Sequence, residues 1–145
     1  MADDKQIIGW MDVTPSGMAA KGKFARGTRV GNLVFLSGQT AFDMDDKLMG
    51  VGSPRAQARN ALANIKSLLA VAGAKMSDVV KITVYVTDVS YRPEVYDEIF
   101  KAFKGKAPSS TGLVVNGLAR KELLVEIDAI AAIADTPKKA TKKKR

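Results

Sequence analysis

The 145-residue sequence contains no cysteine and no histidine. Without cysteine, the protein forms no disulfides and offers neither a thiol nucleophile nor a cysteine-ligated zinc site. Without histidine, a Ser-His-Asp triad and the common imidazole metal sites are excluded as well. Any general base must therefore be a carboxylate, a lysine, a tyrosine or a positioned water.

Long apolar runs are missing too. The run at 68–74 is far shorter than the roughly 20 residues that are needed to span a bilayer. The first five residues are acidic and polar and do not resemble a signal peptide. We therefore expect a cytoplasmic protein with no membrane partner, and a chain of this length suits one domain.

Charge is unevenly distributed along the chain. The formal net charge is +8, and basic residues within 136–145 supply six of these charges, which leaves +2 on the rest. We predict a single domain over 1–135 and a disordered, solvated basic tail over 136–145. A basic run of this kind can also bind nucleic acid through counterion release, so nucleic-acid contact stays open as an alternative.

Two helices are expected from the sequence. Ser53 can cap a helix that has Pro54 at its favoured first position and is closed by Gly73. Within it, apolar residues recur at spacings of three and four, which makes one stripe for a sheet to cover. A second helix is expected over 90–103, where Val95, Ile99 and Phe103 share one face.

Strands are expected on either side of these helices. The alternation of apolar and polar residues over 79–86 predicts a strand with one buried face. Further strands are expected at 7–12, 33–37, 113–115 and 123–133, with a loop at 22–29 and an exposed turn at 43–52. We therefore predict an α+β fold, a mixed β-sheet with both helices packed on one face. The sequence leaves open whether water or another subunit covers the other face.

One strand carries two carboxylates. Glu126 and Asp128 are two residues apart in an otherwise apolar segment, so they lie on the same face of the strand. One interpretation is a solvated strand face, and the other is a carboxylate base that faces a cleft. The spacing alone does not separate them.

The glycines near 50 and 105 lack the remainder of a nucleotide-binding motif and are interpreted as turns.

Four blocks of sequence, in order and at compatible spacing, resemble one known family. They are VGNLVFLSGQ at 30–39, a helix at 56–74 that closes with Ala-Gly-Ala, DVVKITVYVTD at 78–88 and LVEIDAIA at 124–131. These blocks are similar to those of the reactive intermediate deaminase (Rid, YjgF) family. The resemblance implies a chorismate-mutase-like fold and a homotrimer with clefts between subunits.

The resemblance also implies a chemistry. Deaminases of this family hydrolyse small enamines and imines without a metal or an organic cofactor. Glu126 matches the glutamate that positions the water. Ser37 and Gly38 match a pair that lines the cleft, and Gly112 matches a position whose backbone carbonyl helps to hold the water.

Other positions depart from the family pattern. The arginine that pairs with the substrate carboxylate falls on Ser110, a tyrosine falls on Phe24, and an asparagine falls on Tyr96. Losing a charge-assisted bidentate contact costs roughly 2–5 kcal/mol of binding. Either another cation substitutes, or the substrate differs from the usual 2-imino acids, or the cleft binds without reacting.

Several nearby residues complete the predicted site. Arg26 and Lys23 are candidates for the substituting cation, because they lie in the segment that reaches the cleft in the family. Thr111 offers a hydroxyl beside Ser110, although such residues also commonly begin a turn or a strand. We predict a cofactor-independent hydrolase of small enamines or imines. The alternative is a non-catalytic metabolite-binding or regulatory trimer whose basic tail contacts a partner such as nucleic acid.

Overall fold

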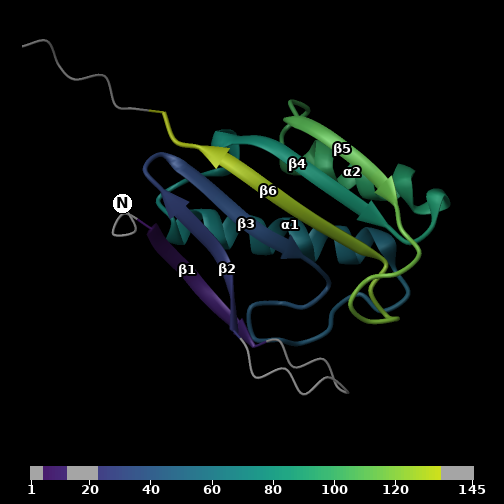
Figure 1. Cartoon of the computed structure of the whole chain (residues 1–145). Coiled ribbons are helices and arrows are strands. Elements are labelled where there is room, and N and C mark those ends of the chain that lie inside the picture. Colours follow the sequence, from purple (N-terminus) through teal and green to yellow (C-terminus); the bar gives the residue numbers. More distant parts are fainter. Residues whose placement is uncertain (1–4, 13–22, 135–145) are drawn as a thin grey trace, which may run out of the picture.

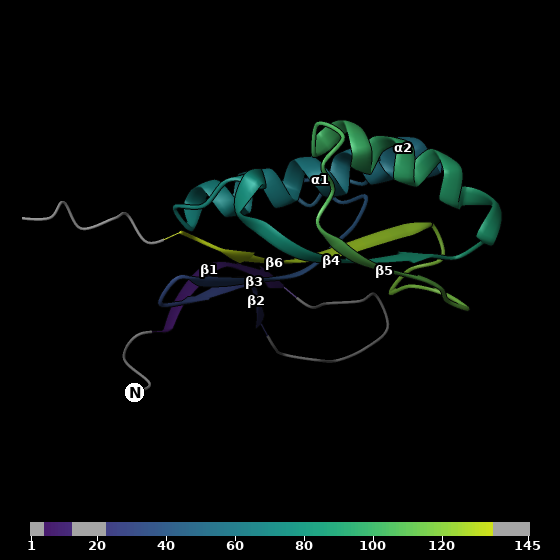
Figure 2. The same ribbon diagram turned by 90° about the horizontal axis from the view of Figure 1, so that it is seen from above.

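The computed structural model describes residues 5–12 and 23–134. They form one six-stranded sheet in the order β1-β2-β3-β6-β4-β5, with both helices on one of its faces (Figures 1 and 2). Only β4 and β5 pair in parallel, and the other neighbours are antiparallel. The elements are β1 (Lys5–Asp12), β2 (Lys23–Val30), β3 (Leu33–Gln39), α1 (Pro54–Val71), η2 (Met76–Asp78), β4 (Val79–Val86), η3 (Val89–Tyr91), α2 (Arg92–Ala102), β5 (Ser109–Val114) and β6 (Val125–Ala132).

Helix α1 forms as the sequence predicts. The Ser53 hydroxyl oxygen accepts a hydrogen bond from the backbone N–H of Ala56 at 3.1 Å, which satisfies one of the free donors of the first turn. The chain leaves the helix through Gly73, whose φ of +77° lies in the left-handed region that glycine adopts without strain. The buried side of α1 packs on the sheet and includes Ile65 and Leu69.

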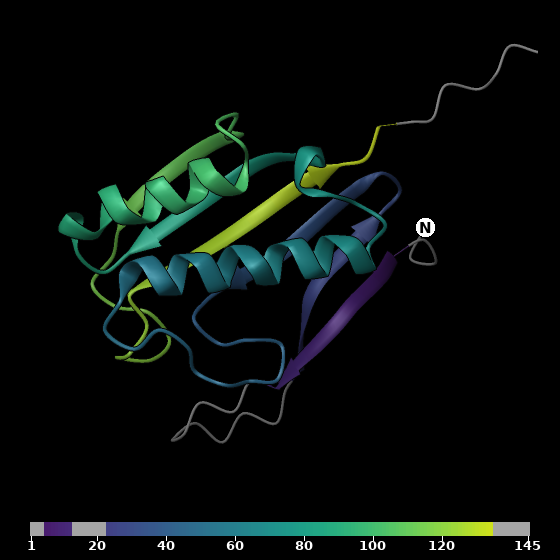
Figure 3. The same cartoon turned by 180° about the vertical axis from the view of Figure 1, so that it is seen from behind.

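Helix α2 begins two residues later than predicted. The Asp88 carboxylate accepts hydrogen bonds from the backbone N–H and the hydroxyl of Ser90, which holds 89–91 in a separate 3-10 turn. The α-helix then starts at Arg92 and buries Val95 and Ile99. Seen from behind, α1 and α2 lie side by side across the sheet (Figure 3).

An ion pair network around one buried carboxylate joins the two helices. Glu98 of α2 is nearly inaccessible and receives hydrogen bonds from Arg59 and Arg55 of α1 at 3.0–3.1 Å. The hydrogen bonds from Arg59 are the largest cause of a lowered pKa for Glu98, to about 2, followed in the same direction by those from Arg55. The carboxylate is therefore ionised at neutral pH and part of the helix packing.

Two strands differ from the sequence prediction. The segment predicted to be a loop at 22–29 is strand β2, which pairs with β1 and β3. At its centre, a Cβ on Gly27 would lie 2.6 Å from Leu36 Cδ2, so glycine lets a core leucine pack over the strand. Strand β5 begins at Ser109 rather than at 113, because β4 supplies a parallel partner from Lys81 onward.

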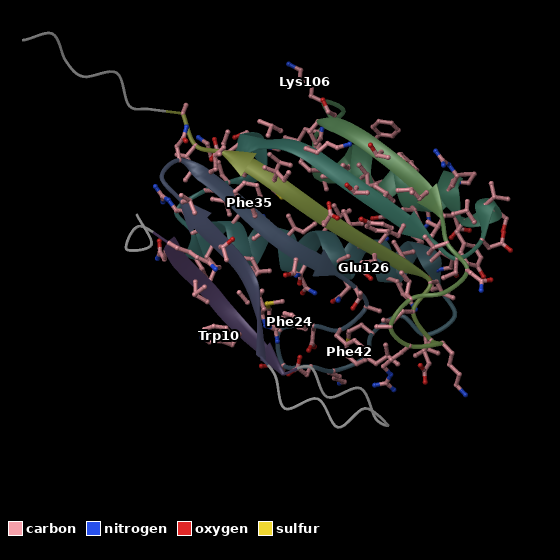
Figure 4. All side chains as sticks on the ribbon, viewed as in Figure 1. Trp10, Phe24, Phe35, Phe42, Lys106 and Glu126 are labelled. Atoms are coloured by element: carbon pink, nitrogen blue, oxygen red, sulfur yellow. The ribbon has the colours of Figure 1, made fainter. Side chains whose placement is uncertain are left out.

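Within residues 5–12 and 23–134, no helix covers the second face of the sheet. Alternation along β6 buries Val125 and Ile127 beneath the helices, and turns Glu126 and Asp128 to the other side. Phe35 lies on this uncovered face with Glu126 (Figure 4) and is 42% exposed. Within the described residues, no helix combines the length and the apolar character that crossing a membrane requires. The predicted basic tail at 136–145 lies outside them.

Candidate functional site

The Glu126 carboxylate lies directly over Gly38. A Cβ at position 38 would stand 1.8 Å from Glu126 Oε1 and 2.6 Å from its Cδ. Gly38 lies in β3 beside β6, where the pairing register shifts between Leu36 and Gln39. Its φ lies outside the left-handed region, so position 38 needs glycine for space and not for backbone freedom.

The surroundings of Glu126 favour a basic carboxylate. Among the residues that the structure describes, none donates a hydrogen bond to Glu126 or places a cation within 4 Å of it. Burial raises the pKa of Glu126, and the negative charge of Asp128 raises it further. A half-buried carboxylate with a raised pKa is a better proton acceptor than an exposed one.

Asp128 differs from Glu126 in its partners. Its carboxylate accepts a hydrogen bond from the Tyr85 hydroxyl at 3.0 Å and another from the Thr83 backbone N–H at 3.2 Å. Burial, and next the hydrogen bond to Asp128, raise the pKa of Tyr85. Asp128 therefore serves the packing of β4 on β6, while Glu126 keeps its oxygens available.

Ser37 lies next to Gly38, and its hydroxyl is already engaged. Ser37 Oγ donates a hydrogen bond to the backbone carbonyl of Ala25 at 2.8 Å. This bond joins β3 to β2 beyond the point where their regular pairing ends, at Gly27 opposite Leu36. Ser37 thus holds the strand that presents Gly38 to Glu126.

A second group of predicted site residues lies at the other side of the sheet. Tyr96 of α2 reaches over β5, so that a Cβ at Gly112 would lie 2.2 Å from Tyr96 Oη. Ser110 is exposed and shares the helix-facing side of β5 with Gly112. Thr111 points to the opposite side, where its hydroxyl oxygen accepts a hydrogen bond from Lys81 Nζ.

One protomer does not bring these two groups together. Strand β4 separates β6 from β5, which puts the backbones of Glu126 and Gly112 about 10 Å apart across the sheet. Glu126 faces the uncovered side, whereas Gly112 faces α2. A small molecule that touches both groups must therefore take them from two different protomers.

Of the two candidates for the substituting cation, the structure describes the side chain of Arg26 but not that of Lys23. Arg26 Nη2 forms an ion pair with Asp46 Oδ1 at 3.0 Å, and Arg26 Nε donates to the Trp10 carbonyl. Its side chain is 13% exposed and its charge holds the loop after β3 against β1 and β2, and the assignment of Arg26 as the substituting cation stays a prediction. The side chain of Lys23 lies outside the described residues. Phe24 is an exposed residue of β2.

Sequence reasoning missed Arg92. Its guanidinium carbon lies 5.1 Å from the centre of the Tyr96 ring, in a cation–π contact. Both terminal guanidinium nitrogens would lie 3.2 Å from a Cβ at Gly112. The only signal in the sequence was the spacing of four between an arginine and a tyrosine at the start of a helix.

A groove of about 1140 Å³ lies elsewhere, between α1 and α2 on the outer side of the helices. Several lysines, among them Lys66 and Lys104, and one arginine, Arg59, line it together with apolar residues such as Phe103. None of the predicted site residues contributes to it. Within 5–12 and 23–134, no group of three or more acidic residues is placed to hold a metal ion.

The sequence has recognisable relatives. A family model described as Endoribonuclease L-PSP matches residues 14–133. The chain is 35% identical to a RutC family protein of Pyrococcus abyssi over 113 residues, which cover 76% of this chain and 86% of that protein. It is 32% identical to the 2-iminobutanoate/2-iminopropanoate deaminase of Dermatophagoides farinae over 120 residues, 83% of this chain and 93% of that protein.

Solved structures are similar over nearly their whole length. A Mycobacterium tuberculosis member of the YjgF/YER057c/UK114 family has a TM-score of 0.73 and 33% identity, covering 89% of this chain and 99% of that one. RidA from an Antarctic Psychrobacter has a TM-score of 0.74 and 32% identity, over 88% and 99% of the two chains. The Escherichia coli YjgF protein has a TM-score of 0.72 and 30% identity, over 88% and 98%.

Proposed function

The chain belongs to the YjgF/Rid family, and on this premise we propose that it hydrolyses small imines or enamines and releases ammonia, without a cofactor. The proposal rests above all on one observation. Glu126 presents a half-buried carboxylate with a raised pKa and no protein donor among the described residues, on the face of the sheet that the helices leave open.

The proposed reaction uses this carboxylate to direct a water. The water oxygen bonds to the imine carbon while Glu126 accepts one water proton, and the imine nitrogen takes up a proton from solvent to give a carbinolamine. Glu126 then returns its proton to the nitrogen, the carbon–nitrogen bond breaks and ammonia leaves. The hydroxyl proton passes to solvent as the oxo group forms, which balances the proton taken up in the first step. One water is consumed for each ammonia released. A carboxylate with a raised pKa suits both transfers, because it exchanges protons closer to neutral pH.

The site is proposed to be completed by neighbouring copies in a homotrimer. The uncovered face of the sheet exposes Leu33 and Phe35, at 39% and 42%, and Leu113 on β5, at 40%. An apolar sheet face of this kind is stabilised by burial against another surface. Because β5 is an edge strand, a partner that meets this face with its β5 edge would also bring its own Gly112 toward Glu126, as the separation of the two groups within one protomer requires.

The substrate is proposed to differ in shape from 2-iminobutanoate. Tyr96 adds aromatic surface at a position where the resemblance implies an asparagine, Phe24 lacks the hydroxyl of the tyrosine implied at its position, and Ser110 brings no charge. Aromatic lining favours a flatter or less polar body than a short aliphatic chain. The reacting group, a carbon–nitrogen double bond or its enamine form, is unchanged by this difference.

Ammonia release tests the proposal. Imines or enamines are generated in situ, and the rate above background is compared for the wild type, Glu126→Gln and a matched control, Glu122→Gln, whose carboxylate pairs with Arg120. We expect the Glu126 variant to fall by about 10²–10⁴-fold, the usual contribution of a positioned acid–base group, and the control to remain active. A wild type that binds such compounds but releases no ammonia above background would favour the non-catalytic metabolite-binding trimer.

Mixed oligomers test the division of the site between protomers. Glu126→Gln and Gly112→Ala each damage a different group, and neither pure variant should release ammonia efficiently. Reassembled together, they form some interfaces in which an intact Glu126 faces an intact Gly112. Recovery of activity on mixing supports the shared site, whereas an inactive mixture of properly exchanged subunits contradicts it.

A further inference from the structure

We propose that Arg92, stacked on Tyr96 above Gly112, binds a carboxylate of the substrate. The inference rests on the proposed function, which it deepens by naming the charged group that the substrate carries. The subsite consists of the Arg92 guanidinium, the Tyr96 hydroxyl and the edge strand β5 beneath them.

The guanidinium is held in place from one side. Arg92 and Tyr96 are four residues apart, so they share one face of α2. The guanidinium carbon of Arg92 lies 5.1 Å from the centre of the Tyr96 ring, in a cation–π contact. The guanidinium N–H groups form no hydrogen bond with the described residues, so they are available for the two parallel hydrogen bonds that a carboxylate accepts.

Gly112 makes room for this arrangement. With any Cβ at position 112, the Tyr96 hydroxyl would stand only 2.2 Å away and both terminal nitrogens of Arg92 only 3.2 Å away. The φ of Gly112 lies outside the left-handed region, so the backbone alone does not require glycine here. Position 112 therefore needs glycine because the polar ends of two α2 side chains lie against β5.

Arg92 has no anionic partner among the described residues. The arginines at 26, 29, 55 and 59 each donate a hydrogen bond to a carboxylate or a backbone carbonyl, and Arg120 forms an ion pair with Glu122 at 3.5 Å. Arg92 has no carboxylate within 4 Å and no acceptor within hydrogen-bond distance there, although it is half-buried. A guanidinium that has lost part of its hydration without a protein acceptor is suited to an incoming anion.

The surroundings favour an organic carboxylate over a free inorganic anion. Phe100 lies beyond Tyr96 on α2, with the ring centres 6.5 Å apart, and it is exposed, so an apolar surface continues from the cation. Ser110 lies about 7 Å along β5 on the same side as Gly112, with a hydroxyl that can bond a second oxygen. A molecule with one carboxylate and a partly apolar body matches both features.

Binding of a product-like acid tests the subsite without catalysis. The affinities of an aromatic 2-oxo acid, phenylpyruvate, and of its neutral amide are measured by calorimetry for the wild type, Arg92→Gln, Arg92→Lys and Gly112→Ala. The matched control is Arg120→Gln, which removes a guanidinium stacked 5.2 Å from the Phe42 ring but paired with Glu122. Thermal melting shows which variants fold, and Gly112→Ala displaces the subsite with the arginine retained.

We expect the wild type to prefer the acid over the amide, and Arg92→Gln to lose roughly 10–100-fold in affinity for the acid but little for the amide. Arg92→Lys should recover part of the preference, Gly112→Ala should lose most of it, and Arg120→Gln should keep it. The proposal is overturned if the wild type shows no preference for the acid over the amide, or if Arg92→Gln retains that preference. If Arg92→Gln does not fold, an unchanged preference for the acid in Gly112→Ala overturns the proposal instead. Acid binding without ammonia release would sink only the proposed reaction, whereas ammonia release with an unchanged KM in Arg92→Gln would sink only the subsite.

Discussion

Replacing Gly38 by alanine should remove activity while leaving the fold intact. The new methyl carbon would lie 1.8 Å from Glu126 Oε1, 2.6 Å from its Cδ and 2.8 Å from its Cγ. To restore an ordinary contact, the carboxylate must withdraw by about 1.5–2 Å. Its position relative to the attacking water changes by the same amount, and misplacement by roughly 1 Å typically costs about 10²-fold in rate.

The stability cost of Gly38→Ala should be small. The three nearest atoms belong to the end of one side chain, which faces the side of the sheet that carries no helix and can move away. The φ at 38 suits alanine, and a compatible Gly→Ala change stabilises by about 0.4–1 kcal/mol through the unfolded chain. We therefore expect the free energy of unfolding to change by less than about 1 kcal/mol, while kcat/KM falls about 100-fold.

Gly50→Ala is the matched control. Gly50 has a φ of +63°, and a Cβ there would lie 2.8 Å from Ala56 Cβ and 3.1 Å from the backbone nitrogen of Gln57. It should cost about 1–3 kcal/mol of stability and leave the activity of the folded protein unchanged. The assays are ammonia release per folded molecule and urea unfolding. Wild-type kcat/KM in Gly38→Ala would refute the placement of Glu126 as the water-directing group, and a loss of several kcal/mol would refute the reasoning about space.

Four further predictions concern charge and assembly. Asp128 helps to raise the pKa of Glu126, the proposed proton acceptor, so Asp128→Asn should move the acid limb of the kcat/KM–pH profile to lower pH. Because the folded state raises this pKa, the ionised Glu126 destabilises the fold above the pKa it has in the unfolded chain, so Glu126→Gln should melt at a higher temperature at pH 7. An unmoved limb or a lower melting temperature contradicts this. Glu98 has a pKa lowered to about 2, so its ionised carboxylate contributes stability that is present above its unfolded pKa and is lost as the pH falls toward 2. Glu98→Gln should therefore cost about 1–2 kcal/mol of unfolding free energy at pH 7, after allowance for the solvent exposure of its cationic partners. At pH 2 the same substitution should cost nearly nothing, as measured by denaturant unfolding. Phe35→Asp should convert an assembly of about three times 15.5 kDa into monomers in light scattering, and an unchanged mass would place the subunit contact elsewhere.

Local signals predicted the helices and the central strands well. Helix α1 follows from a capping serine, a proline at the first position and a closing glycine, each of which acts within a few residues. Strand β4 runs over 79–86 as the alternation predicts. The family resemblance is confirmed as well, because the family model matches residues 14–133. Its four blocks fall in α1 and β4 and in β3 and β6.

Strand β2 could not be predicted in the same way. Its sequence, KFARGTRV, has few apolar residues and a central glycine, which is typical of a loop. It is a strand because β1 and β3 lie on either side and satisfy its backbone groups, a long-range effect that local preference does not contain. The ion pair of Arg26 with Asp46 is likewise not predictable from the sequence, since it depends on where β2 lies in the sheet.

The two carboxylates of β6 show what the spacing of residues predicts and what depends on tertiary packing. Their spacing correctly predicts that Glu126 and Asp128 share a face, but the difference between them comes from neighbours far along the chain. Asp128 is engaged because Tyr85 of β4 reaches it, and Glu126 is available because position 38 of β3 has no side chain. Arg92 and Gly112 repeat this relation on the other side of the sheet: a side chain with unused polar atoms lies over a glycine on another element. In both places the glycine leaves space for a charged side chain, and the folded sheet brings the two residues together. Local sequence patterns do not contain this contact, so the family resemblance identifies Glu126 but does not identify Arg92.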